Sequence, residues 1–205
     1  MLLPVSGVIE RVLRPKDFFD SNPTELEQVV RLVRASFGRD MDFQDVYDHI
    51  TKPEEVYLLR NENLRAMASY SRQKFADQSA LVVEGIAIVP EFQGRGIFRM
   101  ITENMLLEET LICLRTQNPR MYRALQKCCS QVYPQKAQSP VAIKAAILDF
   151  ARHLGCNIDG FGVIKGYYGG LFYGQQPHHL EVDGLFQELG VDLHRGDGLL
   201  VIGKT

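Results

Sequence analysis

The most informative stretch of this chain is IAIVPEFQGRGIFRMI, residues 86–101. An apolar run passes into a polar turn that carries Gly94 and Gly96, and a helix-like spacing of apolar residues resumes at Ile97. The glycines either relieve backbone strain in an ordinary turn, or they expose amides at a helix N-terminus. Such amides are unpaired and carry the positive end of the helix dipole, so they can hold a diphosphate. Both alternatives stay open on these residues alone.

The elements around this stretch predict an α+β chain built on one mixed sheet. Gly85 lies inside the apolar run 80–90, which reads as a central strand with a bulge or a close backbone approach. Periodicity and capping signals predict the rest: strand 8–15, helices 22–38 and 43–50, a hairpin 55–73 around 61–63, helix 97–109, strand 111–114, helix 118–132, helix 141–154 and strand 197–205. A glycine- and tyrosine-rich segment, 160–177, is expected to form short strands and tight turns, with a flexible flap as the alternative.

The composition of the chain argues against several kinds of protein function. The chain has 205 residues, 45% of them hydrophobic, with 23 Lys and Arg against 25 Asp and Glu. It therefore lacks the strong positive field of a nonspecific nucleic-acid binder. No apolar run approaches the ~18 residues of a membrane span, and the opening residues do not form a signal sequence, so we expect a cytoplasmic protein with no membrane or nucleic-acid partner. The four cysteines show no metal-ligand spacing, and no metal is expected.

Two common phosphate-binding motifs do not fit the turn. The dinucleotide pattern GxGxxG fails because its third glycine falls on Arg99. The P-loop pattern fails because the turn lacks its Gly-Lys-Ser/Thr ending. A different diphosphate-binding turn is needed.

Residues 86–98 resemble the acetyl-CoA motif of the GNAT superfamily of acyl-CoA-dependent N-acyltransferases, V-x-P-x-x-(Gln/Arg)-x-x-G-x-(Gly/Ala). Ile88, Pro90, Gln93 and Gly96 match it. The order of elements also fits over about residues 8–132. The resemblance implies a GNAT-like α+β fold, with a mixed, mostly antiparallel sheet flanked by helices. It implies a single domain over 1–205, in which residues 133–205 complete the sheet.

The resemblance also implies a site for acetyl-CoA. Main-chain groups of Ile86 and Ile88 would pair with the pantetheine arm, and the side chain of Asn118 would contact it too. The diphosphate would be held by the amides of Gln93, Gly94, Arg95, Gly96, Ile97 and Phe98. Arg95 and Arg99, one helical turn apart, would face the phosphates. A plain helix N-cap is the alternative role for Asn118.

The chain departs from the family at two positions. Phe98 stands where the pattern prefers Gly or Ala, so its ring must turn away from the phosphates. The family commonly places a tyrosine seven residues after the asparagine, as the acid that protonates the departing thiolate, and Leu125 occupies that position. Tyr122 and Tyr133 are the candidate replacements, with packing as the alternative role of each.

The predicted reaction is direct transfer of an acetyl group from acetyl-CoA to a primary amine. Glu84, on the apolar strand, is the candidate base that takes the proton of the amine, and a surface or ion-paired role is its alternative. Asp159 is a second candidate. The acceptor stays open between small-molecule and peptide amines, and a homodimer is also left open. The rival prediction is a GNAT-like module that binds acyl-CoA as a sensor or interaction domain.

Overall fold

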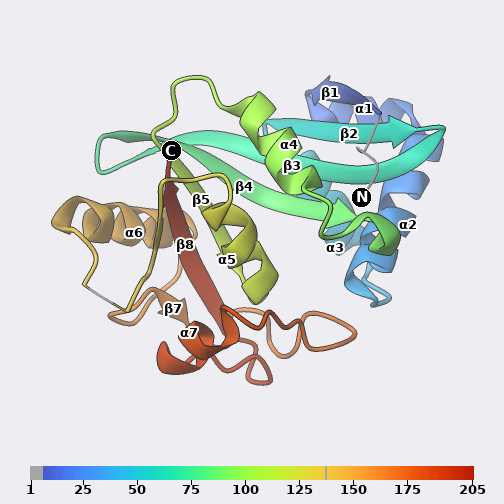
Figure 1. Cartoon of the computed structure of the whole chain (residues 1–205). Coiled ribbons are helices and arrows are strands. Elements are labelled where there is room, and N and C mark those ends of the chain that lie inside the picture. The colour runs from blue at the N-terminus through green and yellow to red at the C-terminus, as the bar shows by residue number, and fades with distance from the viewer. Residues whose placement is uncertain (1–6, 137) are drawn as a thin grey trace. The chain divides into compact units, whose positions relative to one another are not determined.

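The computed structural model describes residues 7–136 and 138–205 (Figure 1). These residues form two compact units that interleave along the chain. The first takes the described part of Met1–Ser71 together with Val83–Met105, and the second takes Arg72–Val82 and Leu106–Thr205. The single domain over 1–205 therefore stays a prediction, and the units are described one at a time.

The first unit contains strands in the order β1-β2-β3-β4. The bounds are β1 Val8–Leu13, β2 Glu55–Asn61, β3 Asn63–Phe75 and β4 Gln78–Ile88, and the last two strands continue into the second unit. β2 pairs antiparallel with both β1 and β3. The predicted hairpin is confirmed, and Glu62 at its tip has a left-handed φ of 57°.

Four helices belong to the first unit: α1 Pro15–Ser21, α2 Pro23–Phe37, α3 Phe43–Thr51 and α4 Ile97–Met105. α2 ends at Gly38 with a φ of 63°, as its sequence predicts. Its apolar stripe is buried in a core with residues of β1, β2 and β3. α1 was missing from the sequence prediction. Pro15 does end the strand, but its fixed φ also suits the first position of a helix.

The second unit is organised around β8 Gly198–Lys204, in the strand order β4-β5-β8-β6. β5 Leu111–Thr116, β6 Gln131–Tyr133 and β7 Val163–Ile164 all pair antiparallel with β8. The helices are α5 Pro119–Gln126, α6 Val141–His153 and α7 Asp183–Glu188. Figure 1 shows β8 running beside β5 and α6. The predicted helix 141–154 and the closing strand are confirmed.

Two predicted helices are shorter than expected. α5 ends at Gln126, because the chain then turns into β6, where Val132 pairs with Gly203. Strand pairing there outweighs the helical spacing of the apolar side chains. α4 ends at Met105, and the amide of Leu107 donates instead to the Glu109 carboxylate at 2.7 Å.

The glycine- and tyrosine-rich segment contains β7 and a series of turns rather than several strands. Two buried polar side chains fix it. Gln117 donates to the carbonyls of Gly170 and Leu193 and accepts from the amide of Phe172. Asp197, fully buried, accepts from the amides of Gly166 and Asp192. Because both side chains are satisfied, the segment is held in one conformation.

Among the described helices, none combines the length and the apolar composition that crossing a bilayer requires.

Candidate functional site

The turn between β4 and α4 lies entirely within the first unit. β4 ends at Ile88, and a 3₁₀ turn, η1 Pro90–Phe92, leads toward α4 at Ile97. The turn is anchored at its start, because the amide of Val89 donates to the carbonyl of Arg65 at 3.0 Å. The amide of Phe92 then bonds back to Val89 at 2.9 Å.

The amides of residues 94–99 donate to no group in the part of the chain that the structure describes. The first bond that enters α4 is that of Met100 to the carbonyl of Gly96, at 3.0 Å. Gly94 and Gly96 have φ values of 75° and 80°, and a Cβ at either would meet no atom within 4 Å. The turn therefore faces open space, and its amides are available to an anion.

The buried side chains of the turn point away from that space. Ile97 is 1% exposed and Phe98 is 5% exposed. The Phe98 ring is thus part of the hydrophobic interior, and the departure from the Gly/Ala preference does not block the amide of that residue.

Gln93 and Ile88 differ from the prediction. The Gln93 amide donates to the carbonyl of Pro90 at 3.2 Å, so it is not available to a phosphate. Its side chain donates to the carbonyl of Ile88 at 3.1 Å, and Ser36 at the end of α2 accepts the amide of Ile88 at 3.1 Å. Both main-chain groups of Ile88 are therefore engaged within the chain, and Gln93 holds the turn closed rather than binding a ligand.

The two predicted phosphate-facing arginines differ in their partners. Arg99 forms an ion pair with Glu103, four residues on, at 3.2 Å. Arg95 is exposed and lies over the ring of Phe92, with 5.0 Å from its guanidinium carbon to the ring centroid. Arg95 is therefore held at the turn without an acidic partner among the described residues.

Glu84, Gly85 and Ile86 lie on β4, and all three are half-buried. Ser69 donates to the carbonyl of Gly85 at 3.4 Å, and a Cβ on this glycine would lie 3.2 Å from the Ser69 hydroxyl oxygen. The group that approaches Gly85 is thus a side chain, and the bulge or close backbone approach expected there stays a prediction. The roles of Glu84 as a base and of Ile86 as a pantetheine contact stay predictions.

Asn118 and Tyr122 belong to the second unit. Asn118 caps α5, since its side chain accepts the amide of Arg120 at 2.9 Å, which is the plain N-cap role. Tyr122 is 2% exposed, and its hydroxyl donates to the carbonyls of Pro134 at 2.6 Å and Val132 at 3.3 Å. Burial raises its pKa to about 12. Its hydroxyl ties α5 to β6, and the role of Tyr122 as a proton donor stays a prediction.

The other candidates are also engaged in the fold. The hydroxyl of Tyr133 donates to Gln131 at 2.9 Å. The Asp159 carboxylate accepts the amides of Phe161 and Val163 at 2.9 and 3.0 Å, so it shapes a turn rather than serving as a base.

Tyr173 is a polar residue that the sequence analysis did not single out. Burial raises its pKa to about 12, while hydrogen bonds from Asn118 and Thr116 act in the opposite direction. The oxygen of Asn118 also accepts the Arg120 amide at 2.9 Å. Only the richness of 160–177 in tyrosine could have pointed to it, because nothing in the spacing relates Tyr173 to Asn118.

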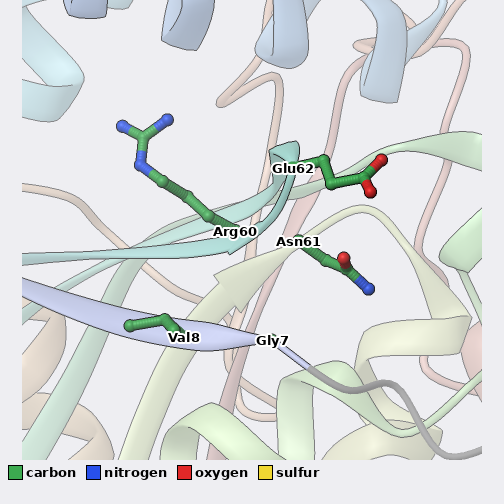
Figure 2. A pocket seen from close by; sticks show the side chains of 5 residues that line it. All are labelled: Gly7, Val8, Arg60, Asn61 and Glu62. Carbon is green, nitrogen blue, oxygen red and sulfur yellow. The ribbon is translucent and has the colours of Figure 1, made fainter.

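Two hollows lie elsewhere on the described surface. One, of about 410 Å³, is lined by Gly7, Val8, Arg60, Asn61 and Glu62, and Figure 2 shows Arg60 pointing away from the side chains of Asn61 and Glu62. Arg60 forms ion pairs with Glu25 and Glu10, so the cation of this hollow is already neutralised. The other, of about 490 Å³, lies in the second unit beside Pro119, Phe186 and His194.

Comparison with known proteins supports the fold. No protein-family model matches the chain, and no curated protein matches it in sequence. An IAA acetyltransferase from Bacillus cereus is similar in structure, with a TM-score of 0.53 and 10% identity, over 98% of this chain and all of that one. A chain of the NatC complex bound to Gag peptide and CoA is similar with a TM-score of 0.54 and 10% identity, over 98% and 99% of the two chains. The chain therefore has the α+β fold of the GCN5-related N-acetyltransferases, the GNAT superfamily.

Proposed function

We propose that this chain is an N-acyltransferase of the GNAT type, which transfers an acetyl group from acetyl-CoA to a primary amine by direct attack. The observation that carries the proposal is the set of unpartnered amides at residues 94–99, between a strand and a helix N-terminus. The fold likeness supports it, since the similar structures are acetyltransferases and one of them is bound to CoA.

The amides would bind the diphosphate of CoA. Helix α4 adds the positive end of its dipole, and Gly94 and Gly96 leave the space in front of the amides open. CoA itself supplies the activated thioester. The chain needs only to hold the donor beside the amine, stabilise the tetrahedral oxyanion and move two protons.

We assign the proton acceptor to Glu84. The amine nitrogen attacks the thioester carbon, the carbon–sulfur bond breaks, and Glu84 takes the proton that the nitrogen loses. The sulfur leaves as the thiolate of CoA and takes a proton from solvent.

The acceptor class is a small-molecule or a peptide amine. One of the similar structures is bound to a peptide, and the other is named for the acetylation of IAA. We place the reaction in the cytoplasm, without a nucleic-acid or membrane partner, and leave a homodimer open. No metal is part of the proposed mechanism.

The test has two stages. Binding of CoA is measured by calorimetric titration, and turnover is then measured with acetyl-CoA against a panel of amines that includes peptides. Binding followed by turnover with one amine class is the expected result. Binding without turnover on any amine would favour the sensor module. A thermal melt with CoA accompanies the titration, because a ligand of the native state must raise the melting temperature. No binding and no rise in melting temperature at millimolar CoA would refute both the enzyme and the sensor module.

A further inference from the structure

A second arginine lies at the turn, and it comes from a distant part of the sequence. Arg65, on β3, places its guanidinium carbon 4.9 Å from the centroid of the Phe92 ring, over which Arg95 also lies at 5.0 Å. The two guanidinium carbons are thus at most about 10 Å apart, which is close to the Debye length of about 8–10 Å at 0.15–0.1 M salt. Arg65, Phe92 and Arg95 are called here the arginine–phenylalanine cluster.

The cluster carries positive charge that the chain does not neutralise. Among the described residues, neither Arg65 nor Arg95 forms an ion pair, whereas Arg99 has Glu103 and Arg60 has Glu25. The ring of Phe92 offsets part of the repulsion through cation–π attraction. It cannot supply the hydrogen-bond acceptors that a guanidinium needs when water is removed.

Arg65 also contains a polar atom that is buried without a hydrogen-bond partner. Its Nε is the one such side-chain atom found among the described residues. Arg65 as a whole is half-buried, and its terminal nitrogens are not among the buried, unpartnered atoms of the described residues. Two cations held in fixed positions, with their donor edges open, form a site for an anion with several oxygens.

We propose that the arginine–phenylalanine cluster binds the 3′-phosphate of CoA and makes the protein select CoA over donors that lack this group. This inference rests on the proposed function, because it assumes that the diphosphate occupies the amides of residues 94–99. A phosphate monoester brings nearly two negative charges and three acceptor oxygens, which match the charge of Arg65 and Arg95 together. The amides alone have no means of sensing that group.

The test compares CoA with 3′-dephospho-CoA, which keeps the diphosphate and the pantetheine arm. Calorimetric titration at fixed ionic strength gives the affinity of each ligand for the parent and for Arg95→Gln, Arg65→Met and Arg31→Gln. Arg31 is an exposed residue of α2 and serves as the matched control. Arg95 is also exposed, so its variant is expected to fold even if the Arg65 variant does not.

We expect the parent and Arg31→Gln to bind CoA about ten- to hundred-fold more tightly than the dephospho form, the range for hydrogen bonds to a charged group. In Arg95→Gln this ratio should fall most of the way to one, through weaker binding of CoA only. Equal affinities in the parent would overturn the inference and leave the proposed function standing. The inference would also be overturned if the ratio of the affinities for CoA and 3′-dephospho-CoA kept the parent's value in both Arg95→Gln and Arg65→Met. Failure of both ligands to bind the parent would instead refute the proposed function.

Discussion

Replacement of Gly96 by glutamate tests the diphosphate site directly. Gly96 has a φ of 80°, and a Cβ there would meet no atom within 4 Å. The new side chain therefore has room, and two effects are expected. The left-handed backbone costs about 1–2 kcal/mol for a residue with a Cβ, which lowers stability. The carboxylate also stands in the space in front of the amides, which lowers affinity for a diphosphate.

The second effect can be estimated from charge alone. Two unit charges 4 Å apart repel by about 1 kcal/mol in water and about 4 kcal/mol at the effective dielectric constant of a protein surface. The turn is exposed, so an intermediate value applies to each charge of the diphosphate. We expect Gly96→Glu to bind CoA at least about tenfold more weakly than the parent, and more weakly still if the carboxylate accepts the bare amides itself.

Two control variants separate strain from charge. Gly155, which follows α6 in the second unit, has a φ of 64° and also no atom within 4 Å of an added Cβ. Gly155→Glu should lose similar stability but keep the parent's affinity for CoA. Gly96→Ala should lose stability, by a few degrees of melting temperature, and keep affinity within a few-fold.

Affinity is measured by calorimetric titration with CoA, and stability by thermal melts without ligand. The reasoning fails if Gly96→Glu binds CoA as tightly as Gly155→Glu does. It also fails if Gly96→Ala loses affinity as fully as Gly96→Glu, since backbone strain and not charge would then be the cause.

Three further predictions concern the proposed proton transfers and the C-terminal segment. Tyr122→Phe should lower the free energy of unfolding by about 1–3 kcal/mol, because it removes the hydrogen bonds that its hydroxyl donates to the carbonyls of Pro134 and Val132; a urea midpoint equal to the parent's would contradict this, and rate assays of the same variant test the predicted role of Tyr122 as a proton donor. Glu84→Gln should slow turnover and lose the acidic limb of the pH–rate profile, and an unaltered profile would remove Glu84 from the mechanism. Burial alone would raise the pKa of Asp197, but hydrogen bonds from Arg195 and two amides outweigh it and hold that pKa well below its usual range. Stability from Asp197 is therefore full above about pH 4 and lost as the pH falls further; urea midpoints at pH 7 and pH 3 should show this loss in the parent and a smaller one in Asp197→Asn.

The sequence predicted the elements whose signals are local. Helix α2 has Pro23 at its first position, Gly38 after its last residue and an apolar stripe, and the β2–β3 hairpin has its turn residues, so each is specified by neighbours in the chain. The turn at residues 89–97 is also specified by local signals, because its two glycines and the apolar residues that follow them predict a turn and the start of a helix.

Features that depend on distant partners were not predictable in the same way. Val132 fits the stripe of a longer α5, but its pairing with Gly203 on β8, 71 residues away, places it in a strand. Tyr122 and Tyr173 look alike in the sequence. Only the fold shows that one hydroxyl meets two carbonyls and the other meets Asn118 and Thr116. Arg65 could not be related to Phe92 before β3 and the turn were placed together.

The engagement of Gln93 and Ile88 explains why the turn is ready for a ligand before one arrives. β4 would otherwise end with an unsatisfied donor and acceptor at Ile88, and Ser36 and the Gln93 side chain satisfy them. The turn thus has no need of its outer amides for its own stability. Because these amides are already fixed in direction, a diphosphate does not have to order the turn when it binds, and little affinity is lost to conformational entropy. We therefore expect the glutamine of the motif to act through the turn that it holds, and the amides from Gly94 onward to contact the diphosphate.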